Sequence, residues 1–278
     1  MTLILWLVLP VVLSALTICS RHRAAPERAR PAPRELIRRA LAVLPSSDDS
    51  QAVQRAIDRV LATDPRVDVM VVGPAASQLR TVTPRVTVLG HLASCDQTEA
   101  LRAGAARALA SDYDAVIEVS VEHSRLARRI TPLLDALDDG AHVAVGSRYV
   151  PGGRVIGCSH PRRWASRSAN AALRWVTGLP VNDVTAQIRA YRRPAVEDAL
   201  MRADGTERTL GLDIMWRCWH AGLRMREVPV TAAGPMCGHV TPAEGRQLLA
   251  RVVSWRRPPA LDGPPVERLL DVTEPVAL

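Results

Sequence analysis

The residues best suited to chemistry in this sequence stand just after short apolar runs. The carboxylates Asp48, Asp49 and Glu122 and the cation Arg148 each follow such a run. Carboxylate oxygens hold divalent cations such as Mg²⁺ or Mn²⁺, and guanidinium groups bind phosphate through paired N–H donors. The combination indicates a site that handles phosphate groups.

The apolar runs alternate with helical patterns, which is typical of βαβ units and a parallel sheet. Strands are predicted at residues 40–44, 67–72, 86–90, 114–120 and 142–147, and helices at 51–62, 99–110 and through 127–137. Ligands of such sheets bind at the carboxyl ends of the strands. The loops that follow residues 44, 72, 120 and 147 are therefore the expected place of the site.

The composition fits a folded protein with anionic partners. The chain has 278 residues, is 47% hydrophobic and 23% charged, and carries a net charge of +8, with arginine as its only basic residue besides histidine. These values exclude a disordered or fibrous chain. A pI near 10.2 favours phosphates and acidic lipids as partners. No nucleic acid is expected, because basic stretches interleaved with aromatic residues, zinc-finger spacings and RNA-binding motifs are all missing from the sequence.

The chain is expected to begin with a membrane anchor. Residues 1–20 are uncharged and apolar over a length close to a bilayer's thickness, and arginines follow in a Pro/Arg linker at 21–34. By the positive-inside rule we expect a single-pass protein of the cell membrane, with its bulk in the cytoplasm. Residues 35–256 are predicted to form one globular domain and residues 257–278 a flexible tail.

Two motifs in the second half carry a resemblance to a known family. Residues 146–153 read GSRYVPGG, and residues 183–193 read DVTAQIRAYRR. Together they make the chain similar to family 2 glycosyltransferases, and specifically to the polyprenyl-phosphate (dolichol-phosphate) mannose synthases, over about residues 41–256. The resemblance implies an α/β, GT-A-like and Rossmann-like fold, a mixed sheet flanked by helices. It also implies transfer of a hexose, most simply mannose, from a nucleotide diphosphate sugar to a polyprenyl phosphate on the cytoplasmic face.

The same resemblance assigns roles to particular residues. The residues implied for donor binding are Pro45, Asp48, Asp49, Ser120 and Glu122, with Glu122 also as the ligand of a Mg²⁺ or Mn²⁺ cofactor. Those implied for binding the acceptor phosphate are Arg148, Arg162, Arg163 and Arg189. The catalytic set is Glu122, Arg148 and Arg189. The residues expected to support the loops are Gly152, Gly153, Asp183, Thr185 and Asp213.

The donor half departs from the family pattern, whereas the acceptor half keeps it. Where the family has Asp-Asp after its second strand, this chain has Gly73-Pro74, and where the family has Asp-Ala-Asp, residues 120–122 read Ser-Val-Glu. A single carboxylate holds a divalent cation less tightly than two. Two hypotheses stay open: a divergent transferase with a rebuilt donor site, or an inactive relative that binds lipid phosphate or serves as a scaffold for a partner membrane subunit.

Two further features each allow two interpretations. Asp213 could face the site or pair with Arg217 one helical turn later. Trp164 and Trp175 are eleven residues apart, near three helical turns, and arginines surround them. They could pack in the core, or the segment could lie at a bilayer interface.

Overall fold

The computed structural model describes residues 34–46, 49–74, 79, 83–89, 97–203, 209–233 and 252. The predicted anchor at 1–20, residues 21–33 of the predicted linker and the predicted tail at 257–278 lie outside these ranges. Within the described ranges, no helix is both long and apolar enough to cross a bilayer.

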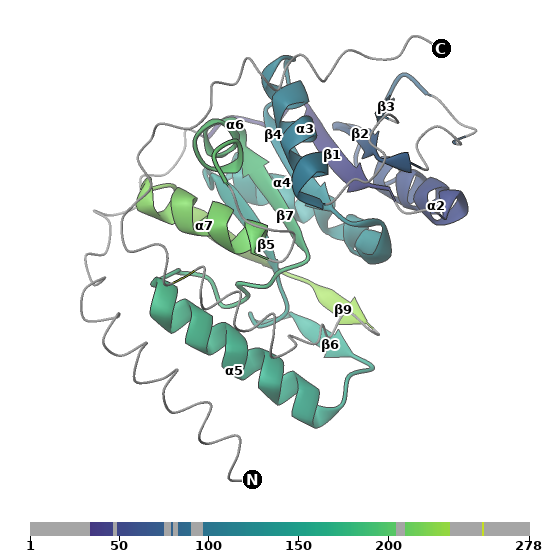
Figure 1. Cartoon of the computed structure of the whole chain (residues 1–278). Helices are drawn as coiled ribbons and strands as arrows, with labels where there is room; N and C mark the ends of the chain where they lie inside the picture. Colours follow the sequence, from purple (N-terminus) through teal and green to yellow (C-terminus); the bar gives the residue numbers. More distant parts are fainter. Residues whose placement is uncertain are drawn as a thin grey trace.

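A seven-stranded sheet forms the centre of the fold (Figure 1), in the order β3-β2-β1-β4-β7-β5-β8. Its strands are β1 (Ala40–Pro45), β2 (Val67–Val72), β3 (Val86–Leu89), β4 (Ala115–Val119), β5 (Val143–Ser147), β7 (Ile188–Arg192) and β8 (Met225–Pro229). Strand β7 runs antiparallel to both of its neighbours, and the other pairs are parallel. The sheet is therefore mixed, as the family resemblance implies, rather than wholly parallel as the alternation alone predicts.

Helices cover both faces of this sheet (Figure 1), so its central strands are buried on both sides. The helices are α2 (Ser50–Leu61), α3 (Gln97–Leu109), a 3₁₀ helix η2 (Val121–Arg129) that leads into α4 (Ile130–Asp138), α5 (His160–Thr177), the short α6 (Arg193–Ala195), a π-helical turn η3 (Val196–Leu200) and α7 (Leu210–His220). Leu41 and Val43 of β1 pack with α3 and α7, whereas Ala42 and Leu44 pack with α2 and α4. This two-sided burial explains why β1, β2 and β5 are largely apolar.

A small second sheet lies beside the main one, on the same side of the molecule as α5 (Figure 1). It pairs β6 (Arg154–Ile156) with β9 (Thr231–Ala233) in parallel. In Figure 1 this pair and α5 lie together at one side of the molecule, below β5. Because α5 stands in sequence between β5 and β7, both of the loops that join it to the main sheet begin or end at the expected site.

The predicted strands at 40–44, 67–72, 86–90, 114–120 and 142–147 all lie within a residue or two of β1 to β5. The strand β7 was not predicted. Three of its five residues are Arg189, Tyr191 and Arg192, all of them buried. Buried charge at these positions disguises the apolar pattern that identifies an interior strand.

Candidate functional site

The predicted site residues gather where the parallel strands end. Strands β1, β4 and β5 point the same way, because β1 and β4 are parallel and β7 runs against both β4 and β5. Their last residues are Pro45, Val119 and Ser147. Ser120 and Arg148 follow directly, so both lie at the edge where α/β sheets bind ligands.

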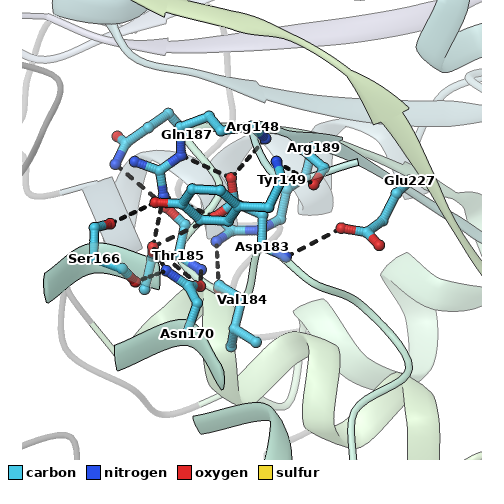
Figure 2. A network of polar contacts seen from close by, with 11 residues as sticks. Arg148, Tyr149, Ser166, Asn170, Asp183, Val184, Thr185, Gln187, Arg189 and Glu227 are labelled. Carbon is cyan, nitrogen blue, oxygen red and sulfur yellow. Dashed lines mark hydrogen bonds and ion pairs between the residues drawn. The ribbon is translucent and has the colours of Figure 1, made fainter. Parts of the chain in front are cut away.

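A buried ion pair joins the loop after β5 to the loop before β7. Arg148 donates from Nε to Oδ2 of Asp183 at 2.7 Å and from Nη2 to Oδ1 at 2.7 Å, and its backbone N–H donates to Oδ2 at 2.9 Å (Figure 2). Asp183 is fully buried and Arg148 is 5% exposed. Burial lowers the pKa of Arg148, but the hydrogen bond and negative charge of Asp183 outweigh burial and raise it. The pair therefore stays charged and fixes both loops.

Side chains of α5 extend this pair into a network. Thr185 Oγ1 accepts from Arg148 Nη2 at 2.8 Å and from Asn170 Nδ2 at 3.1 Å, and the Thr185 backbone N–H donates to Asn170 Oδ1 at 3.1 Å. The hydroxyl groups of Tyr149 and Ser166 lie 2.6 Å apart (Figure 2). The inner side of α5 is thus hydrogen-bonded to both loops.

Glu227 of β8 supports the same loop from the other side. Its Oε1 accepts from the backbone N–H of Asp183 at 3.1 Å, and its Oε2 accepts from Asn182 Nδ2 at 2.8 Å. Asp183 and Thr185 therefore make the contacts of residues that hold loops, which is the role implied for them.

A second buried cluster centres on Glu118 in β4. Its Oε2 accepts from Arg189 Nη1 at 2.9 Å and from the hydroxyl of Tyr191 at 2.8 Å, and its Oε1 accepts from Gln97 Nε2 at 2.6 Å. Burial raises the pKa of Tyr191 well above its usual value, and the charge of Glu118 adds to this effect. A Cβ on Gly211 would overlap the guanidinium of Arg189, so the first turn of α7 packs directly on this cluster.

Arg148 and Arg189, both expected to bind the acceptor phosphate, make buried ion pairs. Arg148 is bound to Asp183 and Arg189 to Glu118. The phosphate contact assigned to each of them stays a prediction. We interpret the two arginines as residues that position loops. Arg162 and Arg163 lie exposed in the first turn of α5, and the phosphate contact assigned to them stays a prediction.

Gly152 and Gly153 form a tight turn after β5. Gly152 has a φ of +86°, which favours glycine. A Cβ on Gly153 would lie 2.7 Å from the carbonyl oxygen of Ser147 and 2.8 Å from that of Arg148. The glycines allow the loop to fold back onto its own strand, which keeps Arg148 close to the sheet edge.

The residues predicted to bind the nucleotide-sugar donor make fewer contacts than the network around Arg148. Pro45 is the last residue of β1, and Asp48 lies outside the described residues. Asp49 is the N-cap of α2, where its Oδ1 accepts from the Ala52 N–H at 2.9 Å. Capping is a frequent role for Asp before a helix, and the donor contact assigned to Asp49 stays a prediction. Gly73 follows β2 with a φ of +124°.

Ser120 and Glu122 lie at the end of β4. The hydroxyl of Ser120 lies 2.5 Å from Nδ1 of His123, and Glu122 is exposed. Burial lowers the pKa of His123; the charge of Glu122 opposes this shift, and Arg148 adds to it. No group of three or more His, Cys, Asp or Glu side chains that could enclose a metal occurs within the described ranges. Glu122 thus offers one carboxylate to a cation.

Asp213 pairs with Arg217. Of the two interpretations of Asp213, facing the site or pairing within its helix, this contact agrees with the second. Arg217 Nε donates to Asp213 Oδ2 at 3.0 Å across one turn of α7, and Asp213 is fully buried. Glu118, Tyr149, Ser166 and Glu227 make site contacts that the sequence does not predict. The signal that could have found Glu118 is a carboxylate in the middle of the predicted strand at 114–120, because a buried charge needs a partner.

Comparisons with known proteins place this geometry in a family. The chain is 31% identical over 230 residues to the polyprenol monophosphomannose synthase of Mycolicibacterium smegmatis, covering 78% of this chain and 86% of that protein. It belongs to the polyprenyl-phosphate mannose synthase family of glycosyltransferases. The undecaprenyl-phosphate mannosyltransferase of Micrococcus luteus is 27% identical over 202 residues, which are 69% of this chain and 83% of that one. No family model matches the chain.

The solved structures show the same fold. Glucosyl-3-phosphoglycerate synthase from Mycobacterium tuberculosis, in complex with Mn²⁺, uridine diphosphate and phosphoglyceric acid, superimposes with a TM-score of 0.52 at 18% identity, covering 78% of each chain. The mixed sheet flanked by helices is therefore the GT-A fold of nucleotide-sugar transferases, as predicted. In this mannose synthase-like chain, both family motifs lie in the network around Arg148 and Asp183.

Proposed function

We propose that this protein transfers mannose from a nucleotide diphosphate sugar to a polyprenyl phosphate. The two relatives named above are synthases of this kind by their names. The observation that carries the proposal is the network that ties Arg148 to Asp183 and Thr185, because it joins the two family motifs into one support at the sheet edge. We further propose that residues 1–20 anchor the chain in the cell membrane with the site on the cytoplasmic side.

The proposed transfer reaction needs no general base from the protein. A phosphate monoester is ionised at pH 7, because its second pKa is about 6, so the acceptor attacks the sugar without a general base. The chain must then bring the phosphate oxygen close to the anomeric carbon and hold it there. In our proposal, the exposed guanidinium groups of Arg162 and Arg163 attract the phosphate, and the fixed loops after β5 and before β7 shape the place it occupies.

A divalent cation is part of this proposal. Mn²⁺ is present in the M. tuberculosis structure with the same fold. When bound, such a cation neutralises the diphosphate that leaves with the nucleotide. Glu122 is the described side chain that fits this purpose, and the diphosphate itself would supply further oxygens. With one carboxylate in place of two, we expect a cation that is held loosely until the donor binds.

The second candidate function is an inactive relative that binds lipid phosphate. The observation that favours it is the loss of carboxylates on the donor side, where Gly73-Pro74 and Ser120 replace acidic residues of the family pattern. Such a protein would retain the acceptor loops and could serve a partner membrane subunit.

Calorimetric titration separates the two functions. The purified full chain in detergent is titrated with GDP-mannose and with UDP-glucose, each with and without Mn²⁺, and in parallel with a short polyprenyl phosphate. A working transferase binds one nucleotide sugar in a Mn²⁺-dependent manner, more weakly in Glu122→Ala and unchanged in the control Glu197→Ala, whose side chain is exposed in η3. Binding of the lipid phosphate alone, indifferent to nucleotide and Mn²⁺, would favour the inactive relative.

A further inference from the structure

A disulfide ends at Cys158, between β6 and α5. Cys158 is disulfide-bonded in the structure, whereas Cys218, buried in α7, takes no part in a disulfide. The remaining cysteines are Cys19, Cys95 and Cys237, and all three lie outside the described residues. The partner of Cys158 is therefore one of these three.

The pairing of the second sheet favours one of them. Strand β6 pairs with β9 in parallel, with Ile156 opposite Ala233. Cys158 stands two residues beyond Ile156 in the sequence, and Cys237 stands four residues beyond Ala233. Paired strands lie about 5 Å apart, and a disulfide needs its two Cα atoms within about 7 Å. The chain that leaves β9 therefore starts within reach of the chain that leaves β6.

The other two cysteines are attached to more distant parts of the fold. Cys95 stands two residues before Gln97, whose side chain donates to Glu118 in β4. Strand β7 separates β4 from β5 in the main sheet, and the second sheet lies below β5 in Figure 1. Cys19 belongs to the predicted membrane span. Cys237 is therefore the favoured partner of Cys158.

The helix that follows Cys158 is held to the body of the protein by few buried side chains. Of the 18 residues of α5, Asn170 and Thr177 are the buried ones. Trp164 is 71% exposed and Trp175 is 43% exposed, so neither tryptophan packs fully in the core. Cys158 stands two residues before the first residue of this helix. A covalent bond at this point fixes the start of a helix that has few other buried contacts.

The surroundings of Cys158 favour thiol–disulfide exchange. Cys158 is partly exposed, and its neighbours Gly157 and Ser159 are exposed, so a small thiol can reach the disulfide. Exposed disulfides are typically the labile or regulatory ones. Arg154 and Arg162 stand four residues before and after Cys158, and positive charge stabilises the thiolate that carries out the exchange. A disulfide in the predicted cytoplasmic location would also be of the redox-sensing kind.

We propose that Cys158 and Cys237 form a redox-sensitive disulfide that ties the start of α5 to the chain after β9. The disulfide forms by exchange with an oxidised low-molecular-weight thiol such as glutathione disulfide. One protein thiolate attacks the small disulfide and releases one small thiolate. The second protein thiolate attacks the protein sulfur of this mixed disulfide and releases the other. Two electrons thus pass from the two protein thiols to the small disulfide, and an excess of the reduced small thiol reverses both steps.

Opening this disulfide has a consequence for the acceptor. Arg162 and Arg163, the predicted phosphate contacts, lie in the first turn of α5, four and five residues after Cys158. With the start of the helix released, we expect the acceptor KM to rise by roughly threefold or more, because side chains that must be ordered on binding cost affinity. This consequence rests on the proposed function, whereas the disulfide itself does not.

Peptide mapping tests the pairing. The full chain is purified in detergent without reductant, treated with glutathione disulfide, alkylated and digested with trypsin. Trypsin places three of the relevant cysteines on separate peptides, with Cys158 on 155–162, Cys237 on 227–246 and Cys95 on 86–102. We expect the first of these peptides to be joined to the second. The join should be lost in Cys237→Ser and kept in the control Cys95→Ser. Cys158 joined to any other peptide, or found alkylated, overturns the proposal.

Glutathione buffers test the redox sensitivity. An excess of reduced glutathione should separate the two peptides, and an excess of glutathione disulfide should join them again. Reduction should also lower the midpoint of thermal unfolding by about 5 °C or more, because it removes a cross-link, and it should leave the midpoint of Cys158→Ser unchanged. A disulfide that persists in excess reduced glutathione overturns the proposal, because it is then a permanent cross-link.

Mannose transfer is assayed separately in the oxidised and reduced protein. Equal acceptor KM values in the two forms would overturn the consequence for the acceptor. A protein that forms the disulfide reversibly but transfers nothing in either form contradicts the proposed function and leaves the disulfide intact.

Discussion

Arg148 and Asp183 form a buried, two-pronged ion pair, with both N···O distances at 2.7 Å and with the backbone N–H of Arg148 on the same carboxylate. The two residues come from the two sequence motifs of the family, 35 positions apart. A bidentate pair is selective for arginine, because its planar guanidinium matches a carboxylate. The pair therefore explains why both motifs are found together: each supplies half of one support for the acceptor loops.

Removing the carboxylate of this pair should destabilise the fold. Asp183→Asn leaves the buried guanidinium of Arg148 without its counter-charge, and we expect a loss of about 3–5 kcal/mol in the free energy of unfolding. Chemical denaturation followed by circular dichroism measures it. The control Asp139→Asn removes an exposed partner of Arg226, and a loss within about 1 kcal/mol is expected there. Equal losses in the two variants would mean that burial does not strengthen the pair.

The close approach of Gly211 to Arg189 makes glycine preferable to alanine at this helix position. Alanine is usually the better residue in a helix, but a Cβ on Gly211 in α7 would overlap the guanidinium that binds Glu118. We expect Gly211→Ala to destabilise by about 1–3 kcal/mol, as overpacking does. The same change should cost clearly less in an Arg189→Met background, because neighbouring changes are not additive. Additive losses in this double-mutant cycle, measured by thermal unfolding, would show that the two residues do not interact.

Stability should fall in mild acid because of His142. Burial lowers the pKa of this side chain and the charge of Arg192 lowers it further, and its Nδ1 accepts from the Arg224 N–H at 3.2 Å. The unfolded chain takes up a proton near pH 6.5 while the folded chain does not, so the free energy of unfolding decreases as the pH falls below about 6.5. His142→Gln should flatten this dependence between pH 7 and 5. The exposed control His160→Gln should not, and a slope that His142→Gln leaves unchanged would refute the assignment.

The cation requirement of the donor side should depend on Glu122. If this carboxylate holds a divalent cation together with the donor diphosphate, Glu122→Gln should raise the Mn²⁺ concentration needed for half-maximal transfer by at least about tenfold. The acceptor KM should stay the same, because the acceptor loops do not contact Glu122 in the described part of the chain. A variant with an unchanged Mn²⁺ dependence would place the cation elsewhere.

Local patterns predicted the strands well and the site contacts poorly. Strands β1 to β5 are short, mostly apolar runs with at most one polar interruption before their last residue, so their positions follow from burial on both faces. The partners of the buried charges do not follow, because Glu118 and Arg189 are 71 positions apart and meet only through the pairing of β4 with β7. From the sequence alone, where these carboxylate partners are not visible, Arg148 and Arg189 are both predicted to bind phosphate. Asp49 is the opposite case, because an aspartate just before a helical pattern is recognisable from sequence as an N-cap, which is the contact it makes.

The transfer reaction itself tests the central claim most directly. The purified full chain, reconstituted in vesicles that contain a polyprenyl phosphate, is given GDP-mannose labelled in the sugar, with Mn²⁺, and the lipid fraction is analysed for label. We predict a labelled lipid that mild acid cleaves to mannose, and a rate that drops strongly in Arg162→Gln with Arg163→Gln while unfolding stability is kept. A lipid fraction without label, from a folded protein given Mn²⁺ and either GDP-mannose or UDP-glucose, would contradict the account and favour a protein that binds lipid phosphate without transferring sugar.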